Sequence, residues 1–151
     1  RLTGADWAEP SQELVRLIGA AEGAQMNGVR FDMASLEGAE NLMIAPGAGI
    51  MTLHAMEQLG ADFAPFLDYL IGLKPAVALH LEPIAELYDA DNPFDAAALA
   101  YHAKRGYLTG FLNALQARAA TGEIEILKIH RTGFGSTFHE AYSIVVWRAA
   151  A

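Results

Sequence analysis

One histidine and two glutamates have the residue types and spacing of an acid–base site. His54 directly follows the apolar run at residues 50–53, Glu57 comes three positions later, and Glu82 ends a second apolar run. An imidazole exchanges protons near neutral pH, and a carboxylate one helical turn away can orient its ring. A carboxylate at the end of an apolar strand requires a partner or a ligand. We therefore predict His54, Glu57 and Glu82 as catalytic residues; the alternative for His54 is that it caps the next helix.

A cluster of aromatic and basic side chains follows, in a chain that is acidic overall. Tyr101 and His102 offer hydrogen-bonding rings, and the guanidinium of Arg105 can clamp a carboxylate or a phosphate. We predict that these residues bind an anionic or hydroxylated small substrate, with His139 in the glycine-rich link at residues 132–140 closing over the same pocket. The alternatives are a basic helix face whose side chains reach into water and a link that simply turns.

Metal and serine chemistry are not favoured. His54 with Glu57, and His80 with Glu82, give two potential ligands each, and no third ligand is fixed by spacing. Ser136 follows a glycine-rich phrase but lies at the wrong offset for a nucleophile elbow. We predict no metal site.

Two aspartates follow short strand-like segments. Asp6 lies close to the start of the chain, and Asp32 lies in the alternating segment at residues 29–33. A carboxylate at the open carboxyl end of a parallel strand can accept hydrogen bonds from two vicinal hydroxyls, as in dinucleotide sites. The alternative is that each aspartate caps the helix or turn that follows it.

The elements that must position these residues alternate along the chain. Apolar residues at helical spacing predict three helices, at residues 10–23, 62–72 and 96–121. Apolar or alternating runs predict five strands, at residues 29–33, 50–53, 76–81, 123–130 and 141–147. The pattern predicts one α/β domain over residues 1–151, a mostly parallel sheet with helices on both faces and a C-terminal antiparallel hairpin.

Several phrases resemble the class I S-adenosylmethionine (SAM) dependent methyltransferases. Three of them, in this order, are similar to the second, third and fourth strands of that family: Gly4-Ala5-Asp6-Trp7, Val29-Arg30-Phe31-Asp32-Met33 and Met51-Thr52-Leu53-His54-Ala55-Met56-Glu57-Gln58-Leu59. Residues 79–83 are similar to the fifth strand, and the final hairpin to the sixth and seventh. The likeness therefore runs from the second strand to the C-terminus.

The resemblance implies a Rossmann-like fold that binds SAM. Asp6 matches the acidic residue that binds the ribose hydroxyls of SAM, and Trp7 the apolar side chain against the adenine. Asp32 matches the residue that accepts from the adenine amino group, and Met33 the neighbour that flanks the ring. The family's central first strand and its glycine-rich turn have no counterpart, because Gly47-Ala48-Gly49 precedes a strand. We therefore expect this chain to be the C-terminal part of a longer protein.

Composition narrows the location and the partners. Ten Lys and Arg against eighteen Asp and Glu give a net charge of −8, which disfavours nucleic acid as a partner. The absence of cysteine fits a cytoplasmic protein. The most apolar stretch, residues 63–81, is interrupted by Asp68, Lys74 and Pro75, so we expect no membrane span; we also recognise no signal peptide.

The resemblance implies an enzyme that transfers a methyl group from SAM to a small-molecule acceptor. Transfer from a sulfonium is an in-line displacement, so positioning supplies most of the catalysis, and a base is needed only for an acceptor that loses a proton. The first alternative is a non-catalytic binding or assembly module, a homo-oligomer if its open sheet edges pair with a second copy. The second alternative is a dinucleotide-dependent oxidoreductase, which also lacks its glycine-rich loop here and gains nothing from the final hairpin.

Overall fold

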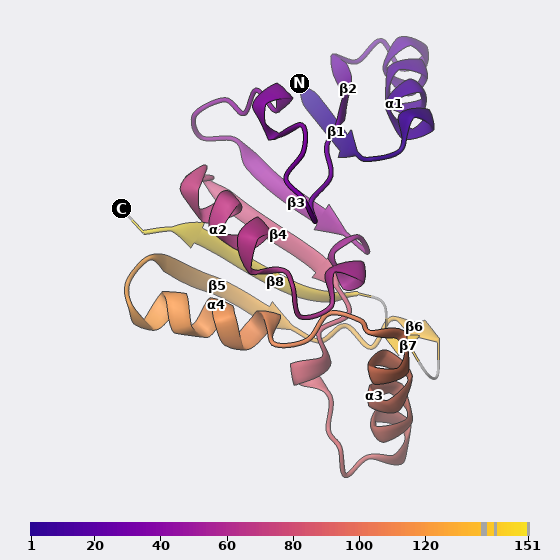
Figure 1. The fold of residues 1–151 in the computed structure, drawn as a ribbon, viewed down its shortest axis with the longest axis vertical. Coiled ribbons are helices and arrows are strands. Elements are labelled where there is room, and N and C mark those ends of the chain that lie inside the picture. Colours follow the sequence, from indigo (N-terminus) through magenta and orange to yellow (C-terminus); the bar gives the residue numbers. More distant parts are fainter. Residues whose placement is uncertain (137–138, 141, 151) are drawn as a thin grey trace. The chain divides into compact units, whose positions relative to one another are not determined.

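The computed structural model of the chain describes residues 1–136, 139–140 and 142–150. The chain forms two compact units, Arg1–Ile44 and Ala45–Ala151. Each unit combines helices with strands, which confirms the α/β class (Figure 1). The single domain predicted over residues 1–151 stays a prediction.

The first unit is a strand–helix–strand crossover. β1 (Leu2–Asp6) and β2 (Met26–Arg30) pair in parallel, and α1 (Glu9–Ala21) connects them. An added Cβ at Gly28 would lie 2.5 Å from the backbone oxygen of Gln12, so glycine lets α1 pack directly on β2. The strand predicted at residues 29–33 therefore begins earlier, because Gly28 lies inside the strand and serves helix packing there.

The second unit is built on a mixed sheet. Its four strands are β3 (Gly49–Leu53), β4 (Val77–Glu82), β5 (Ile124–His130) and β8 (Ser143–Ala149). They lie in the order β3-β4-β8-β5, with β3 parallel to β4 and with β8 antiparallel to both β4 and β5. The predicted antiparallel closing hairpin is confirmed, but only β3 and β4 of this sheet are parallel to each other. A small antiparallel pair, β6 (Gly135–Ser136) and β7 (His139–Glu140), lies in the connection from β5 to β8.

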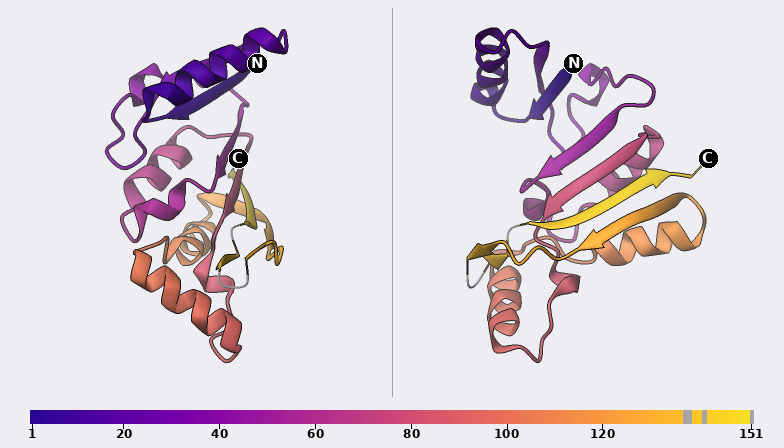
Figure 2. Two further views of the ribbon diagram at one scale, coloured as in Figure 1. Left: turned by 90° about the vertical axis from the view of Figure 1, so that its right-hand side faces the viewer. Right: turned by 180° about the vertical axis from the view of Figure 1, so that it is seen from behind.

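Two helices of the second unit cover one face of this sheet. α2 (Ala64–Gly72) and α4 (Phe111–Ala120) both lie on that face (Figure 2). The fully buried residues of this unit include Leu67, Phe111, Leu115, Trp147 and Val145, and the Phe111 ring of α4 lies 5.0 Å from the His80 ring of β4. On the opposite face, Met51 is 60 % and Leu53 51 % exposed. Among the described helices of this unit, the prediction of cover on both faces is therefore not met.

The helix predicted at residues 96–121 is divided into two. α3 (Pro93–Arg105) ends at Gly106, which has φ +66°, and α4 begins after Gly110, which has φ +83°. Both values lie in the left-handed region that glycine adopts without strain. The apolar spacing continues across the break, which is why the periodicity predicted one helix.

Short 3₁₀ helices occupy three of the connections: η1 (Ala39–Asn41), η2 (Met56–Leu59) and η3 (Ala85–Leu87). Over the part of the chain that the structure describes, every helix is too short or too polar to cross a bilayer.

Replacing Gly106 by alanine tests the break between α3 and α4. An added Cβ has open space at both Gly106 and Gly72, but only Gly106 has a positive φ. We expect Gly106→Ala to lower the free energy of unfolding by about 1 kcal/mol, because the new side chain is strained in the left-handed region. Gly72→Ala, at the end of α2, should raise it by about 0.5 kcal/mol. Urea denaturation measures both, and equal effects would contradict the argument.

Candidate functional site

The turn after β3 brings His54 and Glu57 together. β3 and β4 pair up to Leu53 and Leu81, so their carboxyl ends lie side by side, and the N–H of His54 donates to the carbonyl of Leu81 at 2.9 Å. His54 has φ +49°, an uncommon conformation for a residue with a Cβ. Its Nε2 lies 3.1 Å from Oε2 of Glu57. The side chain of His54 is 33 % exposed and that of Glu57 is buried, so the imidazole is the more accessible of the two.

Glu82 lies beneath this turn and is fully buried. Its Oε2 accepts from the backbone N–H of Ala55 at 3.0 Å and of Met56 at 3.2 Å. Burial raises the pKa of the Glu82 carboxyl, and hydrogen bonds from the Thr52 hydroxyl and the two amides act against that rise. The partner expected for this carboxylate is therefore internal, and this geometry supports a positioning role for Glu82 more than contact with a substrate.

A pocket of about 320 Å³ opens beside Glu57. Its other lining residues are Gln58 from η2 and Arg105, Gly106 and Tyr107 from the end of α3. The guanidinium of Arg105 lies 5.5 Å from the centroid of the Tyr107 ring, and a hydrogen bond to Tyr107 raises the pKa of Arg105. The pocket thus joins a residue predicted as catalytic to one predicted as substrate-binding, with a carboxylate and a guanidinium in one cavity.

Tyr101 and His102 extend this site through aromatic contacts. The Tyr101 ring lies 5.9 Å and the His102 ring 5.6 Å from the ring of Tyr107. A hydrogen bond with Tyr107 raises the pKa of Tyr101, which is 40 % exposed. His102 is buried and also packs on Tyr88, at 5.3 Å, so it supports the cluster from behind. Tyr107 itself was not among the predicted site residues, although its place in the same aromatic and basic run was a usable signal.

In the first unit, Asp6 and Asp32 share one edge of the β1–β2 pair. Asp6 ends β1 and pairs with Arg30 at the end of β2, and Asp32 follows two residues later. Both aspartates therefore lie at the carboxyl edge, the arrangement that the resemblance requires. Trp7 is 72 % exposed and Met33 is half-buried.

The same two aspartates also form local turns, which was the alternative interpretation. Oδ1 of Asp6 accepts from the N–H of Ala8 at 2.8 Å. The carboxylate of Asp32 accepts from the N–H of Ala34 at 2.9 Å and from the hydroxyl of Ser35 at 2.8 Å. These two donors hold the pKa of Asp32 below its ordinary value. The turns fix the direction of each carboxylate. That Asp6 and Asp32 bind a cofactor stays a prediction.

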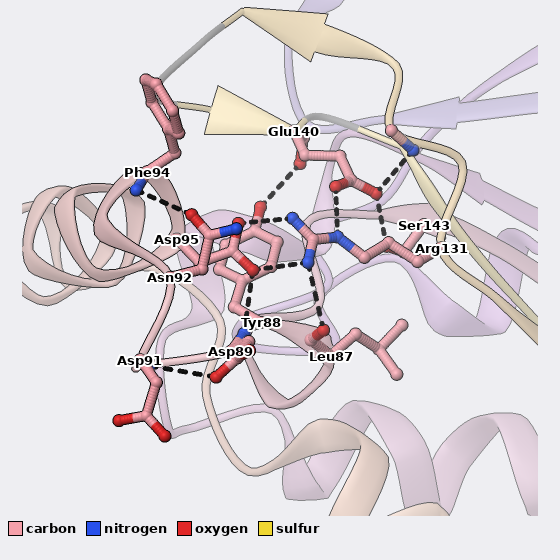
Figure 3. Close-up of polar contacts among 11 residues, drawn as sticks. Leu87, Tyr88, Asp89, Asp91, Asn92, Phe94, Asp95, Arg131, Glu140 and Ser143 are labelled. Carbon is pink, nitrogen blue, oxygen red and sulfur yellow. Dashed lines mark hydrogen bonds and ion pairs between the residues drawn. The ribbon is translucent and has the colours of Figure 1, made fainter.

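An arginine cluster that the sequence did not reveal lies near β6 and β7 (Figure 3). Arg131 makes a two-point ion pair with Asp95, at 2.6 and 2.7 Å, and a third bond, of 2.6 Å, to Glu140. Its guanidinium lies 4.7 Å from the centroid of the Tyr88 ring, and the Tyr88 hydroxyl donates to the carbonyl of Glu140. The cluster thereby ties the connection between β5 and β8 to α3 and η3. Arg131 and Asp95 are 36 positions apart, so no local spacing marks the pair.

Ionisation in the Arg131 cluster follows from these contacts. The Arg131 guanidinium lowers the pKa of Asp95 to about 2. Burial, with the negative charge of Glu140, raises the pKa of Tyr88 to about 12. His139 belongs to β7, but its side chain, predicted to close over a substrate, lies outside the described part of the chain.

No group of three or more metal-ligating side chains occurs among the described residues. Neither a scan against protein-family models nor a search of curated proteins finds a match for this chain. The geometry of the two carboxyl edges and of the pocket therefore carries the functional argument.

Arg131→Met tests how much the cluster contributes to stability. The variant leaves Asp95 and Glu140 without their cation, so we expect a loss of about 2 kcal/mol in the free energy of unfolding at pH 7, reduced from the fully buried case by the partial exposure of Arg131. Because the pKa of Asp95 is lowered in the folded state, its contribution is present above its ordinary pKa and disappears as the pH falls toward 2. The gap between wild type and variant in urea denaturation should shrink over that range.

The matched control for this prediction is Arg148→Met. Arg148 pairs with Glu125, and both side chains are about half exposed. Loss of this surface pair should cost less than about 0.5 kcal/mol. A loss as large as that of Arg131→Met, or a gap that does not depend on pH, would contradict the assignment.

Proposed function

We propose that this chain is the C-terminal part of a SAM-dependent methyltransferase with a Rossmann-like fold, acting on a small-molecule acceptor. The order and direction of the strands carry the proposal. The parallel β1–β2 pair corresponds to the second and third strands of that family, the parallel β3–β4 pair to the fourth and fifth, and β5 with β8 to the antiparallel closing hairpin.

The edges of the two sheets support the same proposal. In the family, a central first strand lies between the second and the fourth. Among the described residues, β1 pairs only with β2, and β3 pairs only with β4. The two strands that would flank the central strand thus each have an unpaired edge, and such an edge is a template for another strand.

The carboxyl edge of β1 and β2 suits adenosine. Asp6 and Asp32 lie at that one edge, and carboxylate oxygens accept hydrogen bonds from ribose hydroxyls and from an exocyclic amine. Their turns hold both carboxylates in fixed directions, which lowers the entropic cost of binding. Trp7 offers an exposed ring for stacking, and Met33 lies beside Asp32.

His54, Glu57 and Arg105 suit the acceptor. Nε2 of His54 lies 3.1 Å from Oε2 of Glu57, so we assign the ring proton to Nε2, which leaves Nδ1 as the basic nitrogen. That nitrogen can take the proton of an acceptor hydroxyl or amine while the lone pair of the acceptor atom forms the new bond to the methyl carbon. Arg105, in the adjoining pocket, provides a site for an anionic group of the acceptor. SAM, when bound, would supply the methyl group: the acceptor atom would bond to the methyl carbon in line with the breaking C–S bond, and S-adenosylhomocysteine would leave as the neutral thioether.

A non-catalytic assembly module is the second candidate. The observation in its favour is the sheet face on which Met51 and Leu53 are more than half exposed, next to the open edge of β3. An apolar face beside an unpaired strand favours association with another chain. Such a module would bind no SAM, so one binding experiment separates the two candidates.

Calorimetric titration of the natural full-length protein with SAM tests the proposal. We expect binding that Asp6→Ala and Asp32→Ala each weaken by about tenfold, the value of one hydrogen bond to a charged group. Asp89→Ala is the matched control, because Asp89 also accepts from the N–H two residues later but belongs to the second unit and not to the β1–β2 pair. Absence of SAM binding, or equal losses in all three variants, would refute the proposed function.

A further inference from the structure

Four buried side chains of the second unit form one continuous chain of hydrogen bonds. It begins at Trp147 on β8, whose indole Nε1 lies 2.8 Å from Nε2 of His80. Nδ1 of His80 lies 2.9 Å from the hydroxyl oxygen of Thr52 on β3. Thr52 in turn hydrogen-bonds Glu82. All four residues lie on the sheet face covered by α2 and α4, and three of them are fully buried.

Each bond in this chain has one possible direction. The indole N–H only donates, so Nε2 of His80 must accept. Burial lowers the pKa of His80 to about 3, so its ring is neutral and its single proton lies on Nδ1. Nδ1–H therefore donates to the Thr52 oxygen, and the Thr52 hydroxyl proton points to Glu82. The core thus sets the orientation of the Glu82 carboxylate.

At its far end the chain holds the backbone between His54 and Glu57. Glu82 receives donors from the Thr52 hydroxyl and from the N–H groups of Ala55 and Met56. All three groups donate, so they favour the ionised carboxylate and act against the rise in pKa that burial causes. Ala55 and Met56 are the two residues between the predicted pair, so their amides fix the path of the turn.

We propose that Glu82, oriented by Thr52 and His80, is a positioning residue that keeps the His54 imidazole paired with the Glu57 carboxylate at the carboxyl end of β3. The inference rests on the proposed function only where it assigns the His54–Glu57 pair a use in catalysis. Its physical content is independent of that function. The buried chain of hydrogen bonds from Trp147 to Glu82, which we call the relay, selects the conformation of an exposed turn, including the left-handed backbone of His54.

The tautomer of His80 in the wild-type protein is the first test, and it needs no variant. Nitrogen-15 NMR of the imidazole ring should show the proton on Nδ1, with no titration between pH 5 and 8. A proton on Nε2 would contradict the direction of the relay. Trp147→Phe removes the indole donor and should release this constraint, so that both tautomers become populated.

Amide hydrogen exchange in Thr52 variants is the second test. Thr52→Val keeps the shape and removes the hydroxyl, so we expect the amides of Ala55 and Met56 to exchange about tenfold faster relative to Leu115 in the core. Thr52→Ser restores the hydroxyl and should restore both rates. The NMR contact between the rings of His54 and Tyr142, 5.6 Å apart in wild type, should weaken in Thr52→Val only.

The outcomes separate positioning from general stability. Equal acceleration at Ala55, Met56 and Leu115, or no rescue by serine, would mean that the relay only stabilises the fold, which would overturn the proposal. None of these measurements requires SAM or an acceptor. The relay can therefore fail while methyl transfer stands, and methyl transfer can fail while the relay stands.

Discussion

The second unit depends on the hydrogen bonds that surround the buried carboxylate of Glu82. A charge enclosed at the carboxyl end of β4 is costly unless donors surround it, and here one hydroxyl and two backbone amides do so. The donors come from β3 and from the turn after it, so the charge ties the ends of two parallel strands together. The hydrogen bonds that these donors make to the carboxylate therefore shape the turn on which His54 and Glu57 lie.

The rest of the covered sheet face is arranged around the same line of groups. Phe111 from α4 packs its ring 5.0 Å from that of His80, which closes the polar chain off from water. The antiparallel strand β8 brings Trp147 next to His80. A parallel strand at the same place in the sheet would require an additional crossover connection. The closing hairpin therefore supplies Trp147, the first residue of the hydrogen-bonded chain, and its bond to His80 ties β8 to β4.

Sequence patterns predicted the elements well wherever one local signal governed them. The buried strand at residues 76–81 and the closing hairpin follow from apolar runs between turn residues. Two predictions were wrong because a competing requirement won. Gly28 serves helix packing inside a strand, and Gly106 with Gly110 interrupts an apolar periodicity that continues across both helices.

The candidate site was predictable in part. The meeting of His54 with Glu57, and the shared edge of Asp6 and Asp32, follow from positions after strands. The Arg131 cluster and the His80–Trp147 contact join residues 36 and 67 positions apart, so only the folded sheet reveals them.

The most direct measurement is amide and indole chemical-shift mapping of the natural protein with S-adenosylhomocysteine, the product that methyl transfer would leave. The proposed function predicts that saturating ligand shifts the Trp7 indole N–H and the amides of Asp32 and Met33, which flank the predicted adenosine site. Signals of these three residues that stay unchanged at saturation would contradict it, because a ligand bound elsewhere would leave the shared edge of β1 and β2 without its proposed role.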